Sequence, residues 1–190
     1  WLNDDYVKFM RFGQHFIEKN GEGVLAFINP HGFLDNTTFR GMRWNLLKTY
    51  DKMYVIDLHG NSKKKEVCPD GSPDQNVFDI MQGVSINIFV KTDQKKKSEL
   101  GKIFHSELYG RRNVKYDTLN QKSFSSIEWD KLENVEPNFF FTPKDFESVA
   151  KYNSGFQMSQ LFQVFSTGIE TKCDDITVHF HVKRILTVTK

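Results

Sequence analysis

The sequence has few cysteines and no long hydrophobic run, and each shortage excludes a class of protein. Its two cysteines, Cys68 and Cys173, stand far apart in no CxxC or Cys/His pattern, which argues against a disulfide framework and a zinc site. No apolar run approaches the roughly 18 residues that a membrane span needs. We also expect no signal peptide. We therefore expect a cytoplasmic protein without membrane or metal partners.

A large excess of charge of one sign is also missing. The chain has 26 basic and 24 acidic residues, for a net charge of +2. This balance excludes a histone-like polycation, so contact with nucleic acid must come from local clusters of lysine. The sequence contains no phosphate loop, which weakens the reading as an unrelated nucleotide-binding α/β domain. It begins at Trp1 within a helix-like pattern, and we interpret it as an excerpt from a longer polypeptide.

Apolar residues are present in short runs with clear boundaries. They make up 38% of the 190 residues, and eighteen phenylalanines are among them, enough for the core of one good-sized domain. The runs 24–28 and 53–58 are continuous, which is typical of parallel strands covered on both faces. Amphipathic patterns predict helices at 3–19, with Phe9 and Phe16 on the buried stripe, and at 37–50. The first sixty residues thus read helix, strand, helix, strand.

The later segments are less regular. Apolar and polar residues alternate over 84–90, which favours an exposed, antiparallel strand near a sheet edge. A further strand is expected around 102–108, and 111–123 is ambiguous. From Phe124 an aromatic segment is predicted to pack on the domain, because consecutive phenylalanines are costly in water. A short helix at 159–165 and a strand at 177–182 follow, where His179 and His181 are expected to be structural.

The order of these motifs resembles the second half of an adenine-N6 DNA methyltransferase. The motifs are GVLAFINPHGFL, FRGMRWNLL, YVIDLHG and NVFDIMQGVSINIFVK. The resemblance is to large restriction-modification proteins that join such a domain to a target-recognition region. It covers residues 1–91, and 152–175 is similar to the piece that leads into target recognition. It implies residues 1–123 as the carboxyl-terminal half of the methyltransferase domain and 124–190 as a linker and the start of target recognition.

The fold class that follows is α/β. We expect a partial Rossmann-like methyltransferase sheet of two parallel strands plus an antiparallel strand, with flanking helices, followed by an α+β linker segment. In that family the last strand is antiparallel and inserted between its neighbours, and 83–90 would be that strand. The alternative is a non-catalytic DNA-recognition or interaction module on an α/β scaffold.

The resemblance also implies what the chain lacks. In the family, S-adenosylmethionine binds at a Gly-rich turn after the first strand, and Asn/Asp-Pro-Pro-Tyr/Phe after the fourth strand holds the flipped adenine. Neither motif is present; Asn29-Pro30-His31-Gly32 follows a different strand and lacks the second Pro and the aromatic. We therefore expect no catalytic residue and no bound cofactor in this chain. The parent protein would need S-adenosylmethionine, DNA and the upstream half of its methyltransferase domain.

Candidate substrate-binding residues follow from position. Phe78 stands where related methyltransferases place an aromatic that stacks on the extruded base; the alternative is one more core phenylalanine. Open α/β sheets bind ligands beyond the carboxyl ends of their strands, so the turn after 24–28 is the second candidate, unless it is shaped for folding only. Its residues are Pro30, His31, Gly32 and Phe33. His31 has no acid or cysteine close in sequence, so we assign it no catalytic role.

Two lysine clusters are candidates for contact with the DNA backbone. They are Lys63, Lys64 and Lys65, and Lys95, Lys96 and Lys97. Each phosphate that such a lysine neutralises would release a counterion and make affinity dependent on salt. The alternative is a solvated face without a partner. Arg40 and Arg43, three residues apart on the second predicted helix, could pair with phosphates or with carboxylates.

Overall fold

The computed structural model describes residues 2–92, 94–96, 98–156, 158–162 and 164. The chain divides into two compact units, Trp1–Lys144 and Asp145–Lys190. The second unit contains the short helices α4 (Glu147–Asn153) and α5 (Met158–Leu161). The strand predicted at 177–182, with His179 and His181, lies outside the described residues, and the functional division at 123/124 stays a prediction. Among the described residues no helix has the length and apolarity for a membrane span.

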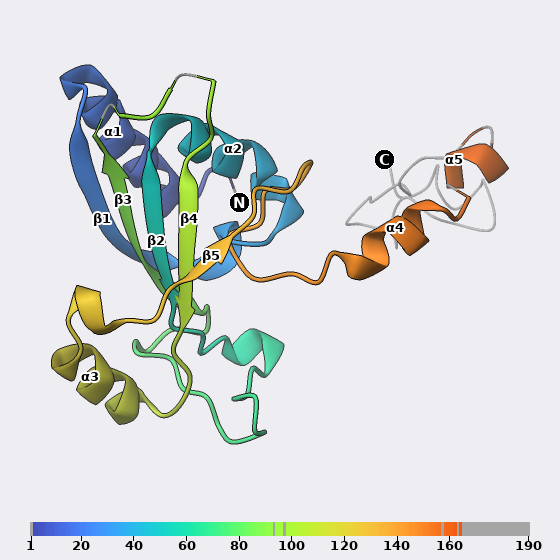
Figure 1. The fold of residues 1–190 in the computed structure, drawn as a ribbon. Coiled ribbons are helices and arrows are strands. Elements are labelled where there is room, and N and C mark those ends of the chain that lie inside the picture. Colours follow the sequence, from blue (N-terminus) through green and yellow to red (C-terminus); the bar gives the residue numbers. More distant parts are fainter. Residues whose placement is uncertain (1, 93, 97, 157, 163, 165–190) are drawn as a thin grey trace, which may run out of the picture. The chain divides into compact units, whose positions relative to one another are not determined.

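The first unit is built on a five-stranded sheet in the order β1-β3-β2-β4-β5 (Figure 1). The strands are β1 (Gly23–Pro30), β2 (Lys52–Asp57), β3 (Val84–Lys91), β4 (Lys102–Glu107) and β5 (Asp130–Leu132). β3 is antiparallel to both neighbours, so β1 and β2 point the same way without pairing directly. β4 is parallel to β2, and β5 is antiparallel to β4. The predicted direction of 84–90 and its insertion between two parallel strands are thus confirmed.

The predicted burial of these strands was wrong in two places. β1 is an edge strand of the described sheet, and Val24 and Ile28 are 61% and 50% exposed rather than covered. β3 is interior rather than near the edge. Its polar residues are buried because they bond one another: the Asn87 Nδ2 donates to Asn29 Oδ1 at 2.9 Å and to Ser85 Oγ at 3.0 Å. Alternation therefore marked a paired polar row and not a solvated face.

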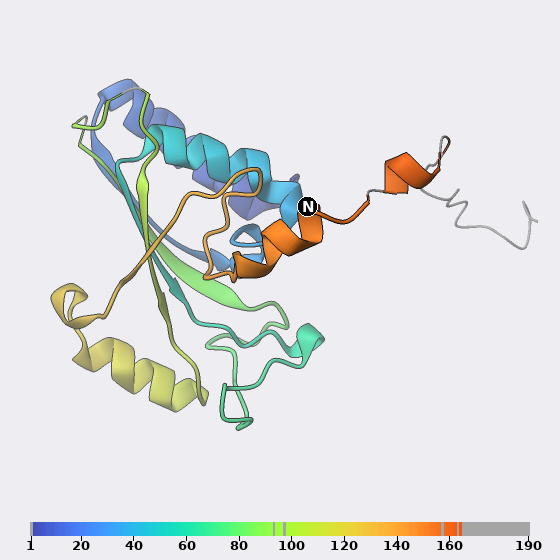
Figure 2. The same cartoon turned by 45° about the vertical axis from the view of Figure 1, so that its right-hand side comes forward.

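Helices cover the sheet on both faces (Figure 2). α1 (Asp5–Asn20) and α2 (Arg40–Thr49) lie on one face, and α3 (Arg112–Gln121) lies on the other. α1 buries Met10 and Ile17, whereas Phe9 and Phe16 are 60% and 52% exposed, contrary to the prediction. The reason is close contact at Gly13, where a Cβ atom would lie 2.7 Å from a methyl group of Leu25.

Turns join these elements. Four are 3-10 helices: η1 (His31–Phe33), η2 (Thr37–Phe39), η3 (Ser62–Lys64) and η4 (Phe124–Ser126). The Asn36 side chain accepts a hydrogen bond from the Thr38 N–H at 2.9 Å and caps η2, which leads into α2. The predicted second helix therefore begins with a 3-10 turn.

The core has two parts, one on each face of the sheet. Under α1 and α2 it includes Phe33, Leu47 and Phe89, and the late residues Phe139 and Phe141 pack into it. The predicted packing of the aromatic segment on the domain is therefore confirmed. Under α3 the core is smaller and contains four buried side chains. They are Ile56, Leu58, Val77 and Val84.

Arg43 joins the aromatic segment to α2 and to the turn after β1. Its side chain is fully buried, and it donates to the carbonyl of Asn138 from Nε at 2.9 Å and from Nη2 at 2.7 Å. Its Nη1 donates to Phe33 O at 2.7 Å and to Asn36 O at 2.8 Å. Burial lowers the pKa of Arg43 to about 10. The predicted pairing of Arg43 with phosphates or carboxylates was therefore wrong, because its donors are used on backbone carbonyls.

Candidate functional site at the carboxyl edge of the sheet

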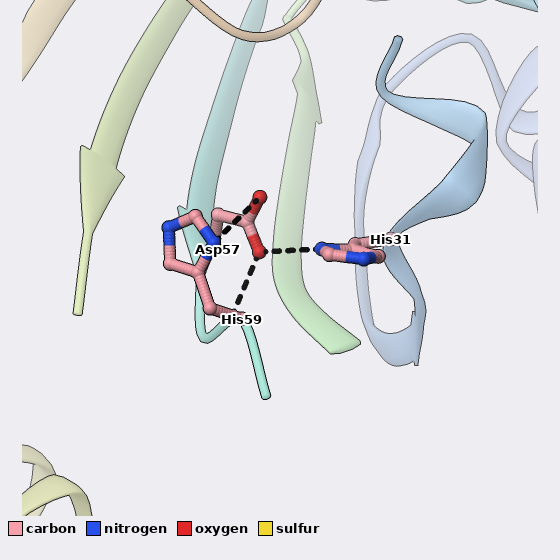
Figure 3. A group of neighbouring side chains, drawn as sticks. All are labelled: His31, Asp57 and His59. Atoms are coloured by element: carbon pink, nitrogen blue, oxygen red, sulfur yellow. Dashed lines mark hydrogen bonds and ion pairs between the residues drawn. The ribbon is translucent and has the colours of Figure 1, made fainter. Parts of the chain in front are cut away.

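His31, Asp57 and His59 meet where β1 and β2 end (Figure 3). His31 directly follows β1, and Asp57 is the last residue of β2. Because both strands point the same way, their carboxyl ends share one edge of the sheet. His31 Nδ1 lies 2.9 Å from Asp57 Oδ1, and Asn61 Nδ2 lies 3.4 Å from His31 Nε2. His31 therefore has a buried carboxylate as partner, 26 residues away in sequence.

His59 is held in a left-handed turn with φ 51°. Its backbone N–H donates to Asp57 Oδ1 at 3.0 Å, and its ring stacks on Tyr109 with centroids 3.8 Å apart. Three carboxylates surround the ring: Asp57 at 3.9 Å, Glu66 at 3.7 Å and Glu107 at 3.6 Å. These distances are those of ion pairs and not of hydrogen bonds.

His59 and the carboxylates around it shift one another's pKa toward the charged forms. Burial lowers the pKa of His59, but Glu107, Glu66 and Asp57 outweigh burial and raise that pKa to about 9. Burial raises the pKa of Asp57, but the hydrogen bond from His31 and the charge of both histidines hold it below its usual value. We interpret His59 as an imidazolium ion surrounded by carboxylates.

The same three side chains each offer one ligand atom, and these atoms lie within 4.8 Å of one another. A metal ion needs deprotonated ligands. His31 would have to give up its hydrogen bond to Asp57, and His59 would have to lose a proton that three carboxylates stabilise. The existing contacts therefore favour a charge network at this edge over a metal centre.

A polar hollow of about 180 Å³ lies beside the cluster. Charged residues of both signs line it, among them Asp35, Lys64, Glu66, Glu107 and Lys144. His31 reaches this hollow, as the predicted role of the turn requires. Phe33 does not: its ring is fully buried and packs against Tyr6 and Phe141, so it supports the turn from the core instead of lining a pocket. Pro30 and Gly32 are partly exposed beside it.

Phe78 lies in the loop between β2 and β3 and is 44% exposed. The alternative that Phe78 is a core residue is therefore wrong. Ile80 and Met81, its neighbours in the loop, are 46% and 59% exposed. All three side chains line a second, more open hollow together with Asn76 and Arg112. Stacking of an extruded base on Phe78 stays a prediction.

The two lysine clusters lie at opposite ends of the parallel strands β1, β2 and β4. Lys63, Lys64 and Lys65 are exposed in and beside η3, at the edge that carries His31 and Phe78. Lys95 lies in the connection between β3 and β4 at the other edge, where its Nζ donates to Lys48 O at 3.0 Å and Glu99 O at 2.9 Å. Lys96 is exposed there. Lys97 lies outside the described residues.

Comparison with protein-family models and with curated proteins found no match. Solved structures do match. The DrdV–DNA complex is 26% identical, covers 71% of this chain with 13% of its own length, and has a TM-score of 0.60. The ATP-dependent Type ISP restriction-modification enzyme LlaBIII bound to DNA is 25% identical, covers 98% of this chain with 12% of its length, and has a TM-score of 0.70.

A third match shows the fold alone. It is a nuclease-deletion mutant of the Type ISP restriction-modification enzyme LlaGI with a DNA substrate mimic, 22% identical over 78% of this chain, with a TM-score of 0.63. The chain thus spans 12–13% of the length of the proteins it matches. It is similar in fold to one segment of much longer restriction-modification enzymes.

Sequence reasoning missed the partners of His31. Asp57 and His59 end the second apolar strand, as His31 ends the first, so the predicted parallel direction of the two strands already placed them at one edge. Glu107 ends β4, which is parallel to β2. Glu107 could be assigned to the cluster around His59 only once the lateral order of the strands was known, and the sequence does not reveal that order. Tyr109, which stacks on His59, had no signal in the sequence.

Proposed function

We propose that this chain is the carboxyl-terminal part of the methyltransferase domain of a restriction-modification enzyme. The parent protein would transfer a methyl group from S-adenosylmethionine to N6 of adenine in DNA. The observation that carries the proposal is β3, which lies antiparallel between the mutually parallel strands β1 and β2. This is the arrangement that the resemblance in sequence implies, and the match to LlaBIII over 98% of the chain supports it.

The described residues do not fit S-adenosylmethionine. The turn after β1 buries Phe33 in the core, and the turn after β2 packs Gly60 tightly against the backbone of Asn76. These turns serve packing and the histidine–carboxylate network rather than a nucleoside or a sulfonium group. We therefore assign cofactor binding and the catalytic tetrapeptide to the upstream half.

The unpaired outer edge of β1 supports the proposal that the upstream half of the domain binds here. An unpaired strand edge is a template for another strand. Val24 and Ile28 expose apolar side chains on this strand, and α1 beside it exposes three phenylalanines. These are Phe9, Phe12 and Phe16, at 60%, 63% and 52% exposure. Leu25 and Phe27 pack into the core under α1 and α2, so Val24 and Ile28 lie on the opposite face of the sheet from the α1 phenylalanines. Exposed apolar residues on both sides of an unpaired strand mark an interaction site. We propose that the upstream half of the sheet pairs with β1 and covers this surface.

The carboxyl edge of the sheet would face DNA. Phe78 offers an exposed ring on which an extruded base could stack, an interaction worth about 1–3 kcal/mol per base. Lys63, Lys64 and Lys65 lie at the same edge and would contact phosphates. The polar hollow beside His31 would form part of the wall near the base. No catalytic role is assigned to these residues.

The test is methyl transfer by the parent protein. Purified parent is incubated with methyl-tritiated S-adenosylmethionine and unmethylated double-stranded DNA, and the digested nucleosides are separated. We expect label in N6-methyldeoxyadenosine and none with the isolated 190-residue chain. Label in cytosine, or DNA binding without any methyl transfer, would overturn the proposal. The second result would favour the alternative of a non-catalytic DNA-recognition module.

A further inference from the structure

We propose that α3 is a clamp that fixes the loop carrying Phe78, with Arg112, Lys115 and Tyr116 as positioning residues for its ring. The conclusion that the loop is clamped stands on geometry alone. The conclusion that this serves the extruded base rests on the function proposed above. The chemistry that the clamp would present is a purine face, recognised by stacking.

Three side chains of α3 hold four consecutive carbonyl groups of the loop. Lys115 Nζ donates to Gln75 O at 2.7 Å, and Arg112 Nε donates to Asn76 O at 2.8 Å. Tyr116 Oη donates to Val77 O at 2.5 Å, and Arg112 Nη2 donates to Phe78 O at 3.0 Å. Each peptide group from 75 to 78 is thereby fixed from the helix.

The positions of these donors on α3 explain how they act together. Residues 112, 115 and 116 are spaced i, i+3 and i+4, so they share one face of the helix. Arg112 also bonds Asp79 Oδ1 at 2.7 Å, beyond the last held carbonyl. Lys115 reaches back to Leu58 O at 2.6 Å, at the end of β2. The helix therefore joins the loop to the sheet.

The loop is also closed on itself by Asn76. Its Nδ2 donates to Gly60 O at 3.2 Å and to Gln82 O at 2.6 Å, while its Oδ1 accepts from the Phe78 N–H at 2.9 Å. The start and the end of the tip, residues 77–81, are thus tied together. Between these ties Phe78, Ile80 and Met81 project into solvent.

This combination points to a binding role. Folding alone gains nothing from holding exposed apolar side chains in one place, since their burial is what stabilises a fold. Ordering a loop before it binds removes the entropy cost from the binding step. The strong donors of α3 therefore preset the direction of Phe78 before a base arrives.

The first experiment measures the clamp itself, by hydrogen–deuterium exchange of peptides covering 74–82 in the parent protein. The variants are Arg112→Gln and Tyr116→Phe, which remove donors without burying a new charge. Arg111→Gln is the matched control, because it removes the same charge from the neighbouring, exposed position. We expect exchange about tenfold faster in Arg112→Gln and a smaller increase in Tyr116→Phe. Exchange equal to that of Arg111→Gln in both variants would refute the clamp.

The second experiment measures methyl transfer by the same proteins. We expect kcat to fall about tenfold in Arg112→Gln, with the KM for S-adenosylmethionine unchanged, and to fall less in Tyr116→Phe. Faster exchange with an unchanged kcat in both variants would refute the positioning role. An equal loss in kcat and in cofactor affinity would refute it too. A wild-type parent that transfers no methyl group would refute the proposed function instead, while the exchange result would still decide the clamp.

Discussion

Lys115 and Asp74 form an ion pair with both side chains wholly withdrawn from solvent, and Lys115 Nζ lies 2.7 Å from Asp74 Oδ1. Removing one member of a buried pair leaves an uncompensated charge. We expect Lys115→Met to lower the free energy of unfolding by about 3–5 kcal/mol. Urea denaturation measures this loss.

Two further variants sharpen the test of this ion pair. Lys122→Met, at an exposed lysine just beyond α3, should change stability by less than about 0.5 kcal/mol. Adding Asp74→Leu to Lys115→Met should restore part of the loss, because no charge is then left buried. A single variant as stable as the wild type would show that the pair contributes nothing.

The charge network around His59 predicts a dependence of stability on pH. The pKa of His59 is raised from 6.5 to about 9 in the folded protein. The folded state therefore holds the proton more tightly than the unfolded state, and this contribution is complete below pH 6.5. It is lost as the pH rises through 9. We expect the free energy of unfolding of the wild type, minus that of His59→Asn, to decrease across this window.

An NMR titration tests the cause of that shift. The midpoint of the His59 ring signals should lie near 9 and should fall in Glu66→Gln and in Glu107→Gln. Both carboxylates are ion-paired with this ring, at 3.7 and 3.6 Å. A wild-type midpoint at or below the usual histidine value would contradict the interpretation of His59 as an imidazolium ion.

Arg43 predicts a second loss of stability, at a different place. Arg43→Met would remove the donor of the buried carbonyl of Phe33 and of the partly buried carbonyls of Asn36 and Asn138, and an unsatisfied buried group costs about 1–3 kcal/mol. We expect a loss of several kcal/mol in urea denaturation and new proteolytic cuts within 133–141, identified by mass spectrometry. Arg40→Met, at an exposed position three residues earlier on α2, is the control and should change neither.

The lysines at the carboxyl edge predict how DNA affinity depends on salt. Each phosphate contact contributes about 0.9 to the slope of log affinity against log salt concentration. Replacing Lys63, Lys64 and Lys65 together by Gln should reduce that slope by up to about three contacts. The control replaces three exposed lysines at the opposite end of the strands that belong to neither cluster, which are Lys19, Lys52 and Lys102. Equal effects of the two triple variants, measured by fluorescence anisotropy, would reject the assignment of DNA to this edge.

Phe78 predicts a separation of methylation from cofactor binding. Phe78→Ala in the parent protein should lower kcat/KM for DNA by roughly 5- to 160-fold, the range that about 1–3 kcal/mol of stacking represents. The affinity for S-adenosylmethionine, measured by calorimetry, should stay the same. Phe78→Trp keeps a stacking surface and should retain most of the activity. Equal loss of methylation and cofactor binding, or no loss of either, would reject the stacking role.

The strands of this protein were predictable because short apolar runs end at glycine, proline or charged residues. Gly23 and Pro30 bound β1, and the start of β2 follows from a similar signal. The direction of β3 was predicted instead from the alternation over 84–90 and from the resemblance. What was not predictable is which strands lie at an edge. Residues such as Val24 and Ile28 look the same whether a second element covers them or not.

The partners of polar residues were also hidden. His31 and Asp57 are joined only when two strands are placed in parallel. Arg43 gives no sign in sequence that its partners are carbonyls, since carbonyls belong to every residue. α3 was ambiguous because its single fully buried residue is Lys115, so no apolar stripe marks its face. The face is instead defined by donors that reach the backbone of another loop.

The position of β3 between β1 and β2 has a consequence for synthesis of the chain. β1 and β2 leave the ribosome first, yet each forms its backbone ladder with β3 and not with the other. Until residue 91 has emerged, the nascent polypeptide holds two apolar segments with no cross-strand neighbour between them. Assembly of this layer therefore waits for the 34 residues between the end of β2 at residue 57 and the end of β3 at residue 91, and both segments stay without their pairing strand during that interval.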